Sequence, residues 1–273
     1  MITRKILRVK IQSILRKANL LKPAEQLRYY IKVIRLRKRN KQFIKEFPGF
    51  SLPPAHLAFD AYSSSHWEFY KVSGEKTAEF IATLINKYFP EHTLHSVYEW
   101  GCGPARVIRH LPDALGKGIE IHASDYNQET IEWCQHHIQG VHFSTNGLRP
   151  PLPYVNDKFD FIYAISVFTH LSEDNSLQWA DELYRVLKPG GILMVTTSGD
   201  RIYEKELLSS ERKLYDTTGI VVRAKYEEGK KMYLAMHSPK YIREKLLRRF
   251  EILEHIPAAF PFMRQDYWIV KRR

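Results

Sequence analysis

The chain has 273 residues, and its 44% hydrophobic and 13% aromatic content suffices for a full hydrophobic core, which excludes disorder throughout. No apolar run approaches the ~20 residues that a membrane-spanning helix needs, and no continuous apolar segment follows the basic N-terminus, so we expect no cleaved secretory signal. The two cysteines, Cys102 and Cys134, lack the spacing of metal ligands. So few cysteines fit a reducing cytoplasm, and we expect a cytoplasmic protein with no disulfide framework and no metal site.

The net charge of +12 belongs to one end of the chain. Residues 1–50 carry 15 Lys or Arg against two acids, a net charge of +13, whereas the other 223 residues carry 27 basic and 28 acidic side chains, a net charge of −1. The proline-rich stretch "FPGFSLPPA" (47–55) favours a boundary between these parts. We therefore expect a basic arm over residues 1–50 and a domain of balanced charge over residues 51–273.

The arm shows helical periodicity twice. One predicted helix has its apolar stripe at Leu7, Ile11, Ile14, Leu15 and Ala18, and a second has its stripe at Leu27, Tyr30, Ile31 and Ile34. Pro23 separates the two helices or opens the second one. The basic arm is therefore predicted to be α-helical.

Predicted helices and strands alternate in the domain. The first helix is expected over 73–89 with Ser73 as its N-cap, and a strand (96–101) and a helical stretch (105–111) follow. The later elements are a strand (118–125), a helix (127–137), a strand (141–146), a central strand buried on both faces (159–168), a helix (175–191), a strand (191–200), a helix (238–248) and strands over 250–256 and 267–273. This alternation predicts a doubly wound α/β sheet.

A glycine-containing turn follows the first of these strands. Gly101 and Gly103 allow a tight turn and a close approach of backbone to ligand, and the helix that follows would present free N–H groups. Two features argue against a dinucleotide: Glu99 would repel phosphate, and Ala105 replaces a third glycine. A carboxylate beside the turn suits a ligand that carries an ammonium group.

Asp125 ends the second predicted strand, 24 residues after Gly101. An acid at this spacing accepts hydrogen bonds from ribose hydroxyls in related nucleotide folds. The ligand would therefore have a ribose and a cationic end but no phosphate, and S-adenosylmethionine meets that description.

Four segments together carry a family resemblance: "VYEWGCGPARVIRHL", "IHASDYN", "FDFIYAISVFTHL" and "ELYRVLKPGGILMVTT". In this order they resemble the class I S-adenosylmethionine-dependent methyltransferases, over roughly residues 60–273. The resemblance implies a Rossmann-like, doubly wound, seven-stranded and mostly parallel sheet whose last strand is antiparallel. It also implies that Ala105 serves only the close packing of helix on sheet.

The resemblance further implies which residues bind the cofactor. Glu99 would lie near the methionine amino group, Gly101 and Gly103 against the methionine portion, Asp125 at the ribose hydroxyls, Tyr126 beside the adenine, Asn146 at the adenine amine and Ser166 at the methionine end. These seven residues are the predicted S-adenosylmethionine site.

Methyl transfer to oxygen or nitrogen also requires the acceptor to lose a proton. His170, just beyond the fourth strand, is the candidate base, and the competing interpretation is that it caps or packs the next helix. Tyr62 and His66 are candidate acceptor residues, although their segment equally fits an aromatic helix packed on the sheet. Tyr203 is a further candidate, because it lies in the long segment 200–239, which we expect to be an insertion at the acceptor site.

The predicted function is methyl transfer to a small-molecule or glycan acceptor, with oxygen chosen as the acceptor atom by analogy. The basic arm leaves three interpretations open: a solvated helix face or lid, contact with an anionic membrane surface, and binding of a nucleic-acid backbone. The last would make the protein a nucleic-acid methyltransferase, although the domain itself has no net positive charge. A catalytically silent scaffold that binds S-adenosylmethionine and, less favoured, a dehydrogenase also remain as alternatives.

Overall fold

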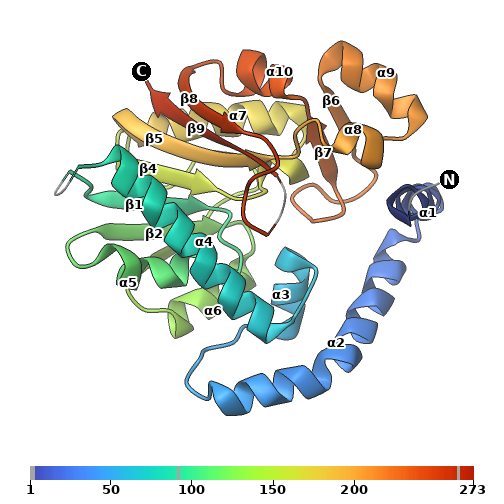
Figure 1. Ribbon diagram of the computed structural model, residues 1–273, viewed down its shortest axis with the longest axis horizontal. Helices are drawn as coiled ribbons and strands as arrows, with labels where there is room; N and C mark the ends of the chain where they lie inside the picture. Colours follow the sequence, from blue (N-terminus) through green and yellow to red (C-terminus); the bar gives the residue numbers. More distant parts are fainter. Residues whose placement is uncertain (1–3, 91–92, 263–264) are drawn as a thin grey trace.

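A seven-stranded sheet with helices on both faces forms the centre of the molecule (Figure 1). The computed structural model describes residues 4–90, 93–262 and 265–273, so residues 1–3 of the predicted arm lie outside it. The strand order is β3-β2-β1-β4-β5-β9-β8. The strands are β1 (Ser96–Trp100), β2 (Glu120–Asp125), β3 (His142–Thr145), β4 (Phe159–Ala164), β5 (Leu187–Thr197), β8 (Phe250–Ile256) and β9 (Asp266–Arg272).

The sheet is parallel except at its last strand. β3, β2, β1, β4 and β5 pair in parallel, and β9 lies antiparallel between β5 and β8. The predicted doubly wound sheet with an antiparallel last strand is therefore confirmed. The chain changes direction of winding between β1 and β4, and in open α/β sheets ligands bind at the carboxyl ends of the strands at such a point.

Each face of the sheet has its own apolar core. Helices α4 (Trp67–Tyr88), α5 (Leu111–Leu115) and α6 (Gln128–His137) pack on one face. Helix α7 (Glu173–Val186), α10 (Pro239–Tyr241) and the π-helical turn η3 (Ile242–Leu246) pack on the other. β1 and β4 are buried along their whole length because both faces are covered, as their continuous apolar sequences predict.

Several predicted boundaries are wrong. α4 begins at Trp67, so Ser73 lies inside the helix with its hydroxyl donating to the Phe69 carbonyl, and it is not the N-cap. The buried Trp67 and Tyr70 explain the earlier start, because they anchor these turns against Phe43. The local sequence favours Ser73 as an N-cap because it is a polar residue of the right type, but it contains no information about the contact of Trp67 and Tyr70 with Phe43.

Three more elements differ from their predicted extents. The stretch 105–111 is mostly turn, with only a 3₁₀ turn η1 (Ile108–His110) before α5. β4 ends at Ala164 because Ser166 adopts a left-handed backbone with φ of 63°, and the 3₁₀ turn η2 (Phe168–His170) follows. α7 ends at Val186, and the following Lys-Pro-Gly-Gly residues belong to β5.

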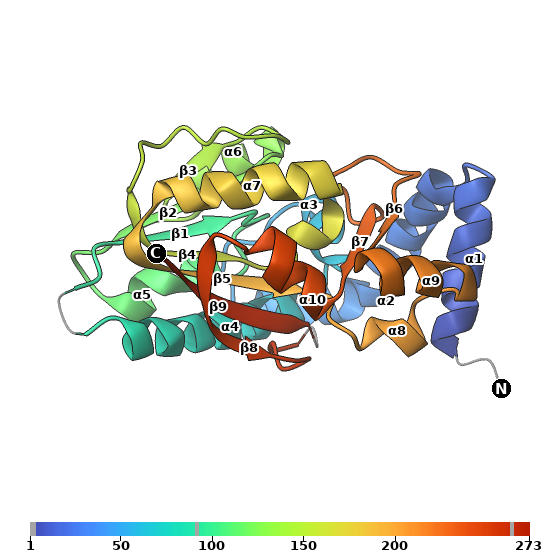
Figure 2. The ribbon, with the colours of Figure 1, turned by 90° about the horizontal axis from the view of Figure 1, so that it is seen from above.

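The arm consists of α1 (Arg4–Lys17) and α2 (Leu21–Glu46), and Pro23 lies in the first turn of α2. α1 lies beside α8 and α9 at one end of the molecule, and α2 runs from there past α3 (Ala55–Tyr62) and α4 (Figures 1 and 2). The arm is attached through its inner side: the buried Arg16 guanidinium donates to the Arg223 and Met232 carbonyls, each at 2.8 Å. Both predicted apolar stripes face outward, with Ile14 65% and Ile34 73% exposed.

Segment 200–239 forms a small substructure of its own. It contains α8 (Ile202–Lys205), α9 (Ser209–Thr218) and the antiparallel strands β6 (Ile220–Arg223) and β7 (Leu234–His237). The loop 224–233, between β6 and β7, runs back to the central sheet, where the Gly229 N–H donates to the His170 carbonyl. Within the described ranges, no helix is both long and apolar enough to cross a membrane.

Candidate active site

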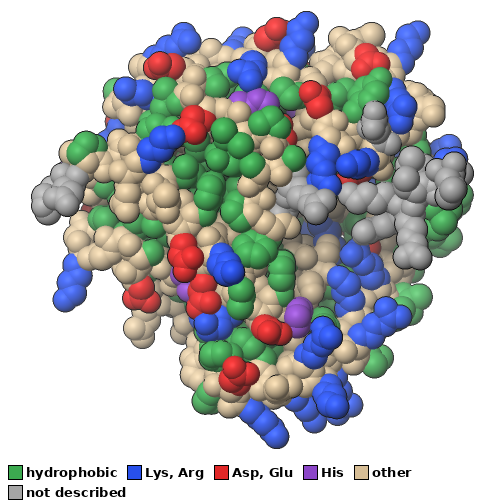
Figure 3. All heavy atoms as spheres, viewed as in Figure 1, with side chains coloured by type: hydrophobic (Ala, Val, Ile, Leu, Met, Phe, Trp, Pro, Cys, Tyr) green, Lys and Arg blue, Asp and Glu red, His purple; other side chains and the backbone are tan. Residues whose placement is uncertain are grey.

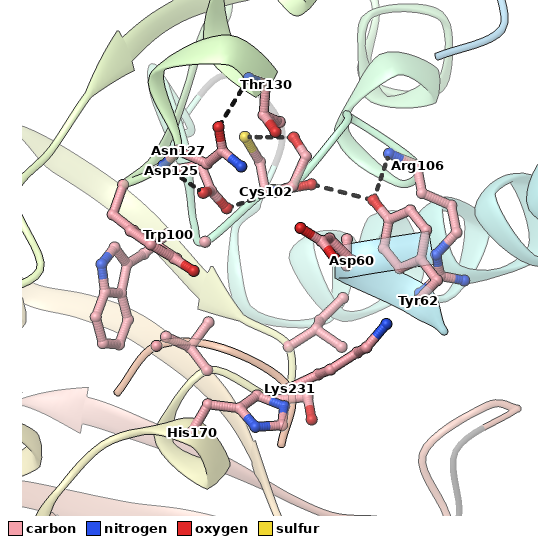
Figure 4. A pocket seen from close by; sticks show the side chains of 18 of the residues that line it. Asp60, Tyr62, Trp100, Cys102, Arg106, Asp125, Asn127, Thr130, His170 and Lys231 are labelled. Carbon is pink, nitrogen blue, oxygen red and sulfur yellow. Dashed lines mark hydrogen bonds between the residues drawn. The ribbon is translucent and has the colours of Figure 1, made fainter. Parts of the chain in front are cut away.

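A cavity of about 470 Å³ lies at the carboxyl ends of β1, β2 and β4 (Figure 4). Its floor is the glycine turn after β1 and the ends of these strands. Its other walls come from α3 (Ala55–Tyr62), from η2 and from the loop 224–233. The cavity therefore lies where the reversal of strand order predicts a ligand site.

Glu99, the next-to-last residue of β1, places a buried carboxyl group in the wall of the cavity. The Tyr163 hydroxyl donates to its Oε2 at 2.9 Å. Burial nevertheless raises the pKa of Glu99 to about 8, because the ionised form loses its hydration. An ammonium group placed in the cavity would offset that loss and favour the carboxylate.

Both glycines of the turn adopt conformations that a side chain would strain. Gly101 has φ of 75°, and a Cβ there would lie 2.4 Å from Cγ2 of Val167. Gly103 has φ of 51°, and its N–H donates to Oδ2 of Asp125 at 3.0 Å. Ala105 also has a positive φ of 54°, so packing alone does not describe its place in the turn.

Asp125 holds the turn and also lines the cavity. Besides Gly103, it accepts a hydrogen bond from the Asn127 N–H at Oδ1 (2.9 Å), and burial raises its pKa. Each carboxylate oxygen has a second lone pair with which it can accept from a ligand hydroxyl. Tyr126, the next residue, forms part of the same wall, and its ring lies beneath Lys230.

Asn146 and Ser166 line the cavity, but both already have protein partners. The Asn146 Oδ1 accepts from the Ser124 hydroxyl at 2.6 Å, and its amide donates to the Gly147 carbonyl at 2.6 Å. The Ser166 hydroxyl accepts from Nε2 of Gln265 at 2.9 Å. Toward a ligand, Asn146 can still offer its second amide N–H and a lone pair of Oδ1, and Ser166 a lone pair of its hydroxyl oxygen.

His170 lies in the opposite wall from Asp125 (Figure 4). Its Nδ1 is 2.9 Å from the Tyr233 carbonyl, an atom that can only accept, so Nδ1 carries the proton and Nε2 has the free lone pair. Burial lowers the pKa of His170 below its usual value, so that the ring is neutral at pH 7. The arrangement leaves an unprotonated imidazole nitrogen on a ring that lines the cavity.

The structure does not bring all the predicted acceptor residues together. Tyr62 lies in the cavity wall, where its hydroxyl is 3.4 Å from the Cys102 carbonyl. His66 and Tyr203 do not line the cavity: His66 Nε2 is 3.6 Å from Glu68, and the Tyr203 hydroxyl donates to Asp216. His66 turns toward Glu68 just ahead of α4, whereas Tyr203 belongs to α8 at the far side of the insertion.

Sequence reasoning missed several lining residues. They are Asp60 on α3, Phe69 on α4, Arg106 after the glycine turn, Lys230 and Lys231 in the loop 224–233, and Phe262. Their sequence positions are up to about two hundred residues apart, and only Arg106 belongs to one of the quoted motifs. The only available signal was the expectation that the insertion contributes to the acceptor site.

Comparison with known proteins agrees with the fold. Residues 97–191 match the family model of the methyltransferase domain. A malonyl-[acyl-carrier protein] O-methyltransferase of Enterobacter lignolyticus (strain SCF1) is 26% identical over 123 residues, a match that covers 42% of this chain and 44% of that protein. The chain thus spans less than half the length of this curated relative.

Among solved structures, two examples resemble this protein in fold. A SAM-dependent methyltransferase from Methanosarcina mazei superposes with a TM-score of 0.51 at 21% identity, covering 69% of this chain and 96% of that one. A protein from Pyrococcus horikoshii OT3 superposes with a TM-score of 0.56 at 15% identity, covering 84% and 99%.

These matches and the fold define a class I S-adenosylmethionine-dependent methyltransferase domain. S-adenosylmethionine is the cofactor of this class. The predicted family and cofactor are therefore confirmed.

Proposed function

We propose that the protein transfers a methyl group from S-adenosylmethionine to an oxygen atom of a small-molecule or glycan acceptor. The observation that carries this proposal is His170, whose free Nε2 belongs to a ring in the same cavity as Glu99 and Asp125. A protein that only bound the cofactor would have no chemical need for an oriented neutral imidazole across the cavity from Glu99 and Asp125.

The residues present fit the cofactor. Glu99, buried and without a cationic side chain bonded to it in the described structure, suits the methionine ammonium, and Asp125 can accept from the ribose hydroxyls. Tyr126 and Asn146 would face the adenine, while the glycine turn and Ser166 would contact the methionine portion. Cofactor and acceptor would thus occupy opposite sides of one cavity.

The chain's own contribution to the reaction is positioning and proton transfer. S-adenosylmethionine supplies a methyl group on a sulfonium, whose leaving group is a neutral thioether. His170 Nε2 accepts the proton of the acceptor hydroxyl as the oxygen–methyl bond forms, and it then releases that proton to water. Alignment of the acceptor oxygen with the methyl group, for an in-line displacement, supplies the rest of the acceleration.

Calorimetric titration with S-adenosylhomocysteine tests the cofactor half of the proposal. We expect micromolar binding by the wild type and binding weaker by about tenfold or more in Asp125→Ala, because two ribose hydrogen bonds are lost. The variant His170→Gln should bind as the wild type does but lose turnover with any acceptor found by screening. Absence of binding by the wild type would refute the cofactor site, and binding without turnover in the screen would favour the silent scaffold.

We also propose that residues 1–50 contact an anionic membrane surface. On α1 the outward stripe is Leu7, Ile11 and Ile14, and on α2 it is Leu27, Tyr30, Ile31 and Ile34, with exposures between 39% and 73%. The outer face of α2 continues with exposed lysines at positions 38, 41 and 45, and Lys and Arg side chains gather over α2 in Figure 3. Exposed apolar residues flanked by cations suit a lipid headgroup region better than a nucleic-acid backbone.

Co-sedimentation of the full chain with phosphatidylserine vesicles tests this contact. Ile34→Glu should reduce the bound fraction about tenfold, since it removes apolar burial and adds a repelled charge. Val155→Glu is the matched control, because Val155 is equally exposed (72%) but lies in the loop before β4. Equal binding by both variants, or preferential binding of the wild type to RNA, would contradict the membrane proposal.

A further inference from the structure

The loop 224–233 places two lysines beside the candidate base. Lys230 and Lys231 line the cavity, and the loop is fixed to His170 on either side of them. The Gly229 N–H donates to the His170 carbonyl at 2.9 Å, and the His170 Nδ1–H donates to the Tyr233 carbonyl at 2.9 Å. Figure 4 shows Lys231 next to His170, across the cavity from Asp125. A group bound by Lys231 would therefore be held close to the base.

Among the described residues, the cavity is lined by three acidic and three basic side chains. Its acidic lining residues are Asp60, Glu99 and Asp125, and its basic ones are Arg106, Lys230 and Lys231. Glu99 and Asp125 are accounted for by the cofactor's ammonium and ribose. Of the cations, Arg106 acts electrostatically on Glu99 and Lys230 lies 5.8 Å from the Tyr126 ring centroid, whereas Lys231 lies next to His170 (Figure 4).

Lys231 is a largely buried cation that contacts both α3 and the arm. Its side chain is 13% exposed, and its ammonium donates to the Phe59 carbonyl at 2.7 Å. The nearest carboxylate, Glu25, is 3.4 Å away and is shared with Arg28, which lies 3.0 Å from the same group. Burial lowers the pKa of Lys231 to about 8 despite the nearby carboxylates of Glu25 and Asp60 and the Phe59 ring, whose centroid is 3.4 Å from the ammonium, so an anionic ligand would stabilise its charged form.

An apolar rim accompanies these cations. Phe69 and Phe262 line the cavity and stack edge to face with 5.9 Å between ring centroids, yet each remains nearly half exposed. An acceptor that placed a charged group at the lysines would have an apolar surface available for the rest of its body.

We propose that Lys231, assisted by Lys230, binds an anionic group of the acceptor, a carboxylate or a phosphate. This inference rests on the proposed function, because it assigns the acceptor half of the same cavity. Lys231 supplies the buried charge, and Lys230, 3.6 Å from Asp60, supplies a second one at the edge. The acceptor class is thereby narrowed to acidic small molecules and phosphate-bearing glycans or lipids.

The test is calorimetric titration of the full chain, saturated with S-adenosylhomocysteine, with malonate and with inorganic phosphate. The wild type should bind both anions, Lys231→Met should bind them about tenfold more weakly or worse, and Lys231→Arg should retain most of the affinity. Lys225→Met is the matched control, since Lys225 is an exposed lysine of the same loop that does not line the cavity. Equal anion binding by Lys231→Met and the wild type would overturn the inference.

Two further measurements keep the test decisive if Lys231→Met is unstable. In the wild type, malonate affinity should fall by about tenfold per pH unit above pH ~8, as Lys231 loses its proton, and a flat profile to pH ~10 would overturn the inference. If the wild type binds S-adenosylhomocysteine but neither anion, the inference is overturned. If the wild type does not bind S-adenosylhomocysteine, the proposed function is refuted instead.

A comparison of inorganic phosphate with the soluble lipid dihexanoyl phosphatidic acid distinguishes the source of the anion. Tighter lysine-dependent binding of the lipid would support a lipid-borne phosphate that also uses the apolar rim. Equal lysine-dependent binding would support a water-soluble anionic acceptor.

Discussion

At the scale of single residues, the site depends on burial that changes protonation. Glu99 and His170 are both pushed toward their neutral forms, the first because its carboxylate is desolvated and the second because its imidazolium is. For His170 the neutral form is the one that a base requires. For Glu99 the neutral form opposes binding of an ammonium, so cofactor binding must be coupled to loss of a proton.

Cofactor affinity should therefore depend on pH. Glu99 has a pKa of about 8 without ligand, and the carboxylate is the form that binds, so affinity should rise by up to about tenfold per pH unit between pH ~6 and ~8 and then level off. Calorimetry with S-adenosylhomocysteine at pH 7 in buffers of different ionisation enthalpy should show release of nearly one proton. Glu99→Gln should bind more weakly, with that pH dependence removed; an unchanged slope in this variant would assign the proton to another group.

At the scale of elements, the turn after β1 is the part most constrained by its surroundings. Gly101 needs both a left-handed backbone and an empty space toward Val167, whereas Gly116 after α5 needs only the backbone, with φ of 80° and no atom within 4 Å of an added Cβ. Comparing alanine substitutions at the two glycines therefore separates the effect of backbone strain on the free energy of unfolding from the effect of a steric clash.

Gly101→Ala should lower the free energy of unfolding by about 3 kcal/mol, the sum of left-handed strain and overpacking, and should weaken S-adenosylhomocysteine binding. Gly116→Ala should cost about 2 kcal/mol, because φ of 80° with ψ of −170° is a conformation that alanine rarely adopts, and should leave binding unchanged. Urea unfolding and calorimetry of both variants measure these quantities. The double variant with Val167→Ala should recover part of the loss at Gly101; no recovery would show that the clash is not with Val167.

At the scale of the whole molecule, the arm is fastened to the loop that lines the cavity. Arg16 donates hydrogen bonds to the Arg223 carbonyl, just before the loop 224–233, and to the Met232 carbonyl near the end of that loop, and Lys231 forms an ion pair with Glu25 on α2. These polar contacts, together with the buried apolar residues Val9, Leu21 and Phe43, hold the inner side of the arm in place, while its apolar stripes remain exposed on the outside.

Arg16→Met should release α1 from the loop, because two buried charge-assisted hydrogen bonds are lost without replacement, a local cost of about 3 kcal/mol. Limited proteolysis should then cleave the arm faster than in the wild type. Arg37→Met, a change at an exposed position of α2, is the control and should leave the cleavage rate unchanged. Equal cleavage of all three proteins would mean that Arg16 does not hold the arm.

The sequence by itself determined the sheet, the glycine turn and the cofactor class, because these depend on local periodicity and on motifs whose residues are adjacent in the chain. Only the tertiary structure decided that His170 is neutral with its proton on Nδ1, since that state depends on the Tyr233 carbonyl and on burial. The same holds for the outward direction of the arm's apolar stripes, because helical periodicity is identical whether a stripe faces a core or the solvent. The tertiary structure also decided the surroundings of Lys231, since Glu25, Phe59 and Lys231 come into contact only when the arm, α3 and the insertion pack together.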